Sequence, residues 1–150
     1  MDDEVSPRAT VSSLLAGVLF GAAWWIYIDG AALGAQAGNE VAKSANAYSW
    51  LPGIGATVSF LMINLLLWSQ ISDAETDKRA ACIARGFLIA AMMIGLGCIA
   101  AALFIMVDVF LNNEAAYTWT GIATFIQCLL IFVSSFIMRF GTINPEDSDY

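Results

Sequence analysis

Histidine is absent from this sequence, and charged residues make up only 13% of its 150 positions. Without histidine the chain cannot build a Ser-His-Asp triad, a histidine-ligated metal site or a histidine pH switch. Only six lysines and arginines stand against thirteen acidic residues, so the basic face that nucleic-acid binding requires is missing. No Ser, Cys or Lys nucleophile has a recognisable base beside it. We therefore expect no enzyme activity, no cofactor, no metal site and no nucleic-acid partner.

Apolar residues are abundant instead. They account for 59% of the chain, and the mean hydropathy is +0.73. A soluble domain is normally about 45–50% apolar and about 25% charged. The excess is too large for one buried core, so the composition indicates a single membrane domain.

Four apolar stretches are long enough to cross about 30 Å of hydrocarbon at about 1.5 Å per residue. Short polar links make the later stretches antiparallel neighbours, and a polar, Ala-rich link at 35–50 joins the first two. Acidic tails occupy 1–10 and 142–150. The predicted fold class is all-α, an integral membrane four-helix bundle. The expected spans are 11–33, 51–71, 83–111 and 118–140, within a membrane domain at 11–141.

The basic residues predict the orientation of the bundle, because they accumulate on the cytosolic side of membrane proteins. Five of the six lie on the side of both termini and the middle loop, and Lys43 lies alone on the other. Both termini are therefore predicted to be cytosolic. The expected interfacial anchors are Trp24, Trp25, Trp119, Arg85 and Arg139.

Two alternatives concern processing. Residues 35–37 (AQA) resemble a signal-peptide cleavage site, but the acidic leading segment and the long apolar stretch favour a retained span. Cys82, at the mouth of the third span, is either a palmitoylation site or an inert thiol. Cys98 and Cys128 are expected to be small apolar packing residues.

Four polar residues fall inside the predicted spans, where such residues are costly and are often functional. Asp29 and Asp108 lie near span ends, where they either anchor the interface or face the bundle interior and bind a proton, a cation or a basic group. Asn64 and Gln127 lie deeper, where amides can hydrogen-bond between helices. These four side chains are the candidate intramembrane contacts.

Small residues at four-residue spacing mark candidate packing faces, because they allow two helix backbones to approach closely. Ser13, Gly17 and Gly21 form such a row on the first span. The third span carries two more, Ala91/Gly95 and Gly97/Ala101. We expect neighbouring helices to dock along these rows.

Several blocks of sequence, taken in order, resemble one known family. They are AGVLFGAAWWIYIDGA (Ala16–Ala31), FLMIN (Phe60–Asn64), Ala84–Arg85, GIATFIQ (Gly121–Gln127) and RFG (Arg139–Gly141). Together they resemble the transmembrane-protein-50 family, which includes a yeast vacuolar-protein-sorting protein. The resemblance covers about 11–141, and the short acidic N-terminal segment departs from relatives that often have a longer, more polar one.

The resemblance implies a four-span protein of endoplasmic reticulum, Golgi or endosomal membranes without enzymatic activity. It also implies a complex with a second small four-span protein, similar to the leptin-receptor-overlapping-transcript family, that acts between late endosome and vacuole. The matching residues have no catalytic role that could be transferred. They are Trp24, Trp25, Asp29, Asn64, Arg85 and Gln127.

The leading hypothesis is a non-enzymatic trafficking subunit that contacts lipid and binds another membrane protein through its spans. Two alternatives are an accessory subunit of a larger membrane complex and a small ion or proton channel or transporter. The last would use Asp29 and Asp108 and predicts a water-accessible cavity joining them.

Overall fold

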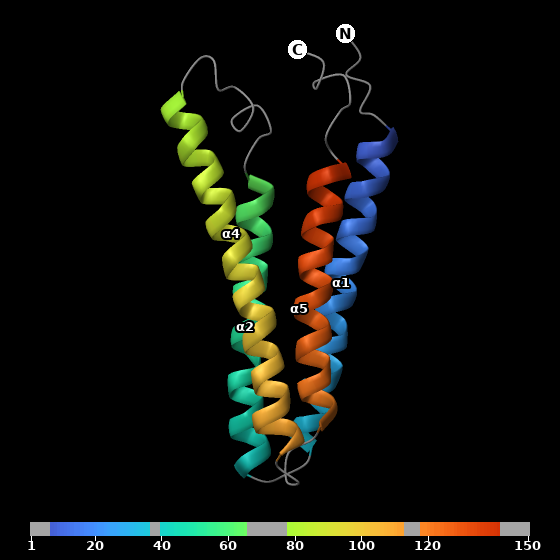
Figure 1. Ribbon diagram of the computed structural model, residues 1–150. Helices are drawn as coiled ribbons and strands as arrows, with labels where there is room; N and C mark the ends of the chain where they lie inside the picture. Colours follow the sequence, from blue (N-terminus) through green and yellow to red (C-terminus); the bar gives the residue numbers. More distant parts are fainter. Residues whose placement is uncertain (1–6, 37–39, 66–77, 113–117, 142–150) are drawn as a thin grey trace.

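The computed structural model describes residues 7–36, 40–65, 78–112 and 118–141, and these residues form four long helices without a strand (Figure 1). Three helices are long and apolar enough to cross a membrane, with mean hydropathies of 1.8, 2.6 and 2.1 in their most apolar windows. The predicted all-α four-helix class is confirmed. The elements are α1 (Pro7–Gln36), α2 (Glu40–Leu65), α4 (Lys78–Ile105), the π-helical turn η1 (Met106–Leu111) and α5 (Thr118–Gly141).

Most of the polar link at 35–50 is helical. Helix α1 continues to Gln36, and α2 already begins at Glu40. The segment is rich in alanine, the strongest helix former, so its polarity does not break the helix. The last part of the predicted second span, 66–71, lies outside the described residues.

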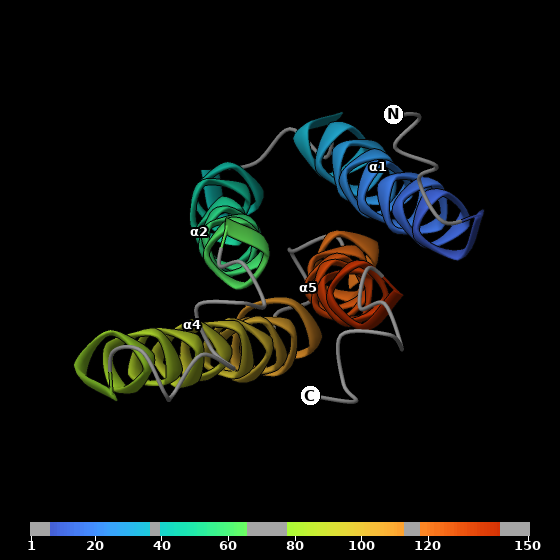
Figure 2. The same cartoon turned by 90° about the horizontal axis from the view of Figure 1, so that it is seen from above.

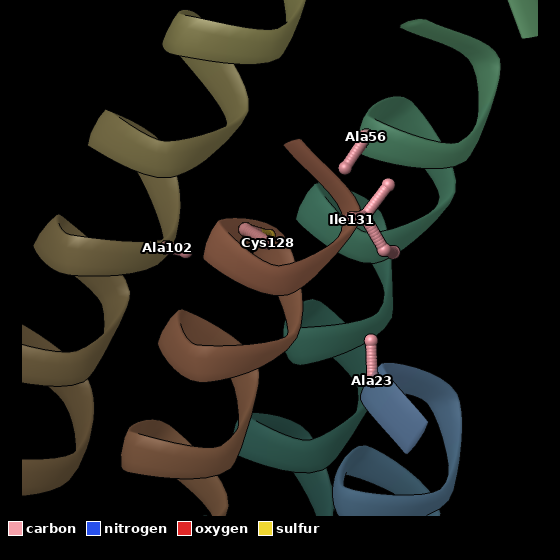
Figure 3. Packing of buried hydrophobic residues seen from close by; sticks show 5 residues of the cluster. All are labelled: Ala23, Ala56, Ala102, Cys128 and Ile131. Carbon is pink, nitrogen blue, oxygen red and sulfur yellow. The ribbon is translucent and has the colours of Figure 1, made fainter. Parts of the chain in front are cut away.

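Helix α5 occupies the centre of the bundle. It packs along α1 on one side and against α2 and α4 on the other, and the view from above shows these three around it (Figure 2). The core is built from small side chains, and every helix contributes to it (Figure 3). Its fully buried members are Ala23, Ala56, Ala102, Cys128 and Ile131.

The sequence of α5 explains its central position. Its buried residues recur every three or four positions, and most are small or carry a hydroxyl group. Such residues let helix backbones approach closely in a membrane, where no hydrophobic force drives helices together. The buried residues are Thr120, Gly121, Ala123, Thr124, Gln127, Cys128, Ile131, Ser134 and Ser135.

The π-helical turn η1 continues α4 at its C-terminal end and packs against α5. The backbone N–H of Asn112 donates to the carbonyl of Val107 at 3.2 Å, which is the i→i−5 spacing of a π-helix. This turn buries Phe110 against Gly121, where a Cβ atom would lie 2.8 Å from the Phe110 Cβ. A side chain at Gly121 would therefore displace Phe110.

Candidate intramembrane interaction site

Hydroxyl groups make the buried interhelical hydrogen bonds of the described residues. Thr120 Oγ1 of α5 donates to the carbonyl of Gly30 in α1 at 2.7 Å, and Ser134 Oγ donates to the carbonyl of Ala16 at 2.8 Å. The same type of bond joins α2 to α4, where Ser59 Oγ donates to the Ala91 carbonyl at 2.7 Å. Each bond is buried and needs closely spaced backbones. Small residues and hydroxyls therefore act together in this bundle.

A fourth contact links α1 to α2 through side chains alone. The Tyr27 and Ser49 hydroxyls lie 2.8 Å apart and are fully buried. The Tyr27 ring stands edge-on to Trp50 with ring centroids 4.9 Å apart, and Trp24 packs edge-on against Tyr27 at 6.1 Å. This aromatic cluster holds the start of the apolar part of α2 against α1.

These hydroxyls were not among the candidate residues named from the sequence. A signal was present, because Thr120, Thr124, Gln127 and Ser134 repeat at three-, four- and seven-residue spacing on the last span. That pattern is a polar stripe on one helix face, and such a stripe in a membrane helix indicates an interface with another helix. Of this stripe, only Gln127 was selected.

Replacing Ser134 with alanine should lower the free energy of unfolding by about 0.6 kcal/mol, the average for hydrogen bonds between membrane helices. The serine hydroxyl bridges α5 to α1, so its removal weakens that pair. Ser135→Ala is a matched control, because the neighbouring hydroxyl bonds only the Ile131 carbonyl of its own helix. Steric-trap or denaturant unfolding in detergent should show a loss for the first variant only; equal losses would contradict a bridging role.

Gln127 is the most unusual polar group in the bundle. Its side chain is fully buried, and in the described residues neither its amide oxygen nor its nitrogen has a hydrogen-bond partner. The amide lies against Gly53 of α2, where a Cβ atom would lie 2.5 Å from the amide oxygen. Gln127 therefore faces the interior of this chain, between α5 and α2, and not its outer surface.

The other candidate polar residues lie apart from Gln127. Asn64 donates to the Phe60 carbonyl of its own helix at 2.8 Å and is half-buried. Asp29 and Asp108 are both exposed, and Trp119 Nε1 donates to Asp29 at 3.4 Å. The structure thus does not gather the four candidates into one site.

Helix α1 has two rows of small residues, one buried against α5 and one exposed. Ala16, Ala23 and Gly30 are buried, and a Cβ atom at Gly30 would lie 2.8 Å from the Ala123 Cβ of α5. The row named from the sequence, which contains Gly17 and Gly21, is exposed instead. A Cβ atom at either of these two glycines would meet nothing within 4 Å. This second row makes no contact within the described chain and stays a prediction as a docking face.

The expected interfacial anchors differ in their surroundings. Trp25 is 75% exposed, Trp119 and Arg85 are also exposed, and Arg139 is half-buried near the end of α5. Trp24 is turned toward the interior of the bundle, against Tyr27. Of the cysteines, Cys128 is buried in the core and Cys82 is exposed.

Comparison with known proteins covers nearly the whole chain. A family model described as "Uncharacterised protein family (UPF0220)" matches residues 3–148. The chain is 36% identical over 140 residues to a transmembrane protein 50 homolog of Dictyostelium discoideum. That match covers 89% of this chain and 90% of the relative. No solved structure matches.

Proposed function

Because this chain belongs to the UPF0220 family and is a homologue of transmembrane protein 50, we propose that it is a non-enzymatic membrane subunit of endomembrane trafficking. It acts in endosomal, Golgi or endoplasmic reticulum membranes, between the late endosome and the vacuole or lysosome. Its partner is a second small four-span membrane protein, similar to the leptin-receptor-overlapping-transcript family. The two proteins bind through their membrane spans.

The observation that carries this proposal is the unused small-residue row on α1, formed by Ser13, Gly17 and Gly21. The row is exposed, and α1 already packs against α5 through a different face. Small residues at four-residue spacing permit close helix contact in lipid. A row that is not covered by any of the four described helices is thus available for a helix of another protein.

Replacing the glycines of this row with leucine should prevent partner binding without unfolding the chain. Gly17→Leu and Gly21→Leu place side chains in open space, so the fold tolerates them while an approaching helix is pushed away. Gly86→Leu on α4 is the matched control, because its Cβ atom also meets nothing within 4 Å. Affinity purification from native membranes in mild detergent, with mass spectrometry, should recover a stoichiometric small membrane protein from the wild type and the control only.

Other outcomes of that purification would count against the proposal. If the Gly21→Leu variant recovers as much partner as the wild type, α1 is not the helix that binds the partner. Recovery of the wild type inside one much larger assembly would favour an accessory structural subunit. Asn64→Leu tests the half-buried amide of α2 in the same way, with reduced recovery expected if that side chain contacts the partner.

A further inference from the structure

An apolar groove runs between α2 and α4, outside the contacts described above. Its volume of about 300 Å³ lies at the lower end of the range for small-molecule sites. No charged side chain lines it, and its only heteroatom-bearing side chain is a thiol. The lining residues are Leu51, Pro52, Ile94, Gly97, Cys98, Ala101 and Ile105.

The groove exists because the middle of its α4 wall is formed by very small residues. Gly97 has no side chain, and a Cβ atom there would meet nothing within 4 Å. Ala101 follows one turn later, while the larger Ile94 and Ile105 stand at the two ends. The row Gly97/Ala101 is therefore not closed by another helix of the described chain.

The α4 wall of the groove is about as long as one leaflet of a bilayer is thick. From Ile94 to Ile105, α4 rises by about 16 Å at about 1.5 Å per residue. This rise is close to half of the about 30 Å of hydrocarbon in a bilayer. Ile94 lies near the middle of the membrane-crossing segment Ala81–Leu111, and Ile105 lies near its end. The α4 wall thus extends from mid-membrane toward one surface, and Leu51 and Pro52 of α2 face it.

The surroundings of the groove match a lipid-facing site. Leu51 and Ile94, in its walls, are themselves 64% and 39% exposed, so the groove continues the apolar surface that contacts lipid. Tyr48, about one turn before the α2 wall of the groove, is 60% exposed. Aromatic side chains of this kind prefer the headgroup level of a membrane. The groove therefore opens where the acyl chain of a lipid begins.

We propose that this groove binds one acyl chain of a membrane lipid. The lipid belongs to the leaflet at the end of the bundle opposite the start of α1 and the end of α5. Its chain lies along Gly97 and Ala101, with its headgroup near Tyr48. This site does not depend on the trafficking role and would persist if that role were disproved.

Photolabelling of the full-length protein tests the site. The protein is reconstituted into phosphatidylcholine vesicles in which a minor fraction of the lipid carries a diazirine on its acyl chain. Mass spectrometry should find adducts concentrated on the lining residues Leu51, Pro52, Gly97, Cys98 and Ala101. Few adducts are expected on Ile89, which is 63% exposed elsewhere on α4. Gly97→Leu should lose most of the groove adducts, because the leucine side chain fills the groove.

Gly86→Leu is the control, since it adds the same side chain to another open position of α4 and should keep the groove adducts. Circular dichroism checks the fold of each variant, and Ala101→Leu replaces Gly97→Leu if that variant does not fold. Equal labelling of the groove and Ile89 would overturn the proposal. A photoreactive amino acid in place of Gly97 that crosslinks to a second copy of the protein, and not to lipid, would also overturn it.

Discussion

Replacing Gly30 with leucine should separate α1 from α5 and lower the free energy of unfolding by about 1–3 kcal/mol, the usual cost of overpacking. The first added carbon already lies 2.8 Å from the Ala123 Cβ and 3.5 Å from the Thr120 Cα. The backbones must move apart to admit the side chain. The hydrogen bond from Thr120 to the Gly30 carbonyl would then be lost as well.

Gly21→Leu in the same helix is the matched control for this prediction. It adds an identical side chain in open space, and leucine favours a helix more than glycine does. Unfolding of the purified protein in detergent should show a large loss for Gly30→Leu and no loss for Gly21→Leu. Similar losses in both variants would mean that the α1–α5 contact does not use this face.

Replacing Gln127 with leucine should stabilise the protein, by about 1–3 kcal/mol, which is the cost of leaving a buried polar group unsatisfied. The amide has no hydrogen-bond partner in the described residues, and leucine is of similar size. The leucine side chain should therefore keep the contact with Gly53, and the substitution eliminates a donor and an acceptor that have no partner.

The sign of this change is the informative part of the measurement. In the same unfolding assay, Ser134→Ala should destabilise the protein because its hydroxyl is bonded, whereas Gln127→Leu should stabilise it. A clear loss of stability in Gln127→Leu would show that the amide is satisfied in the membrane by a water molecule or another group. The amide would then have a role beyond packing.

Hydrophobicity alone was sufficient to predict the helical class, since the stretches 11–33, 83–111 and 118–140 each lie on a long helix. The helix ends were harder to predict. The segment 35–50 has polar residues but strong helix formers, and propensity prevailed over polarity there.

The candidate site was predictable only in part, because rows of small residues on one helix look alike in a sequence. Ala16, Ala23 and Gly30 repeat every seven residues, and Gly17 and Gly21 repeat every four, so neither spacing reveals which row α5 covers. The face of α1 that becomes buried is set by α5, because Ser134 and Thr120 of α5 donate hydrogen bonds to carbonyls of α1. Such pairing between distant segments is a tertiary property.

The polar residues illustrate the same limit. Gln127 and Asn64 are both amides within predicted spans, yet one is buried against α2 and the other bonds its own helix. Their different surroundings arise from the rotation of each helix about its axis. The polar stripe of α5 indicates the rotation that buries Gln127, whereas α2 has no comparable stripe that would place Asn64.

The central claim is that the Ser13/Gly17/Gly21 row of α1 binds another membrane protein. Its most direct test is photo-crosslinking in native membranes, with a photoreactive amino acid in place of Leu14 or Val18. These residues flank the row and are 66% and 67% exposed. Ile89 of α4, with 63% exposure, is the control position. We expect one abundant adduct with a small four-span membrane protein from both α1 positions, and lipid adducts from Ile89. Lipid adducts alone from α1 would contradict the claim.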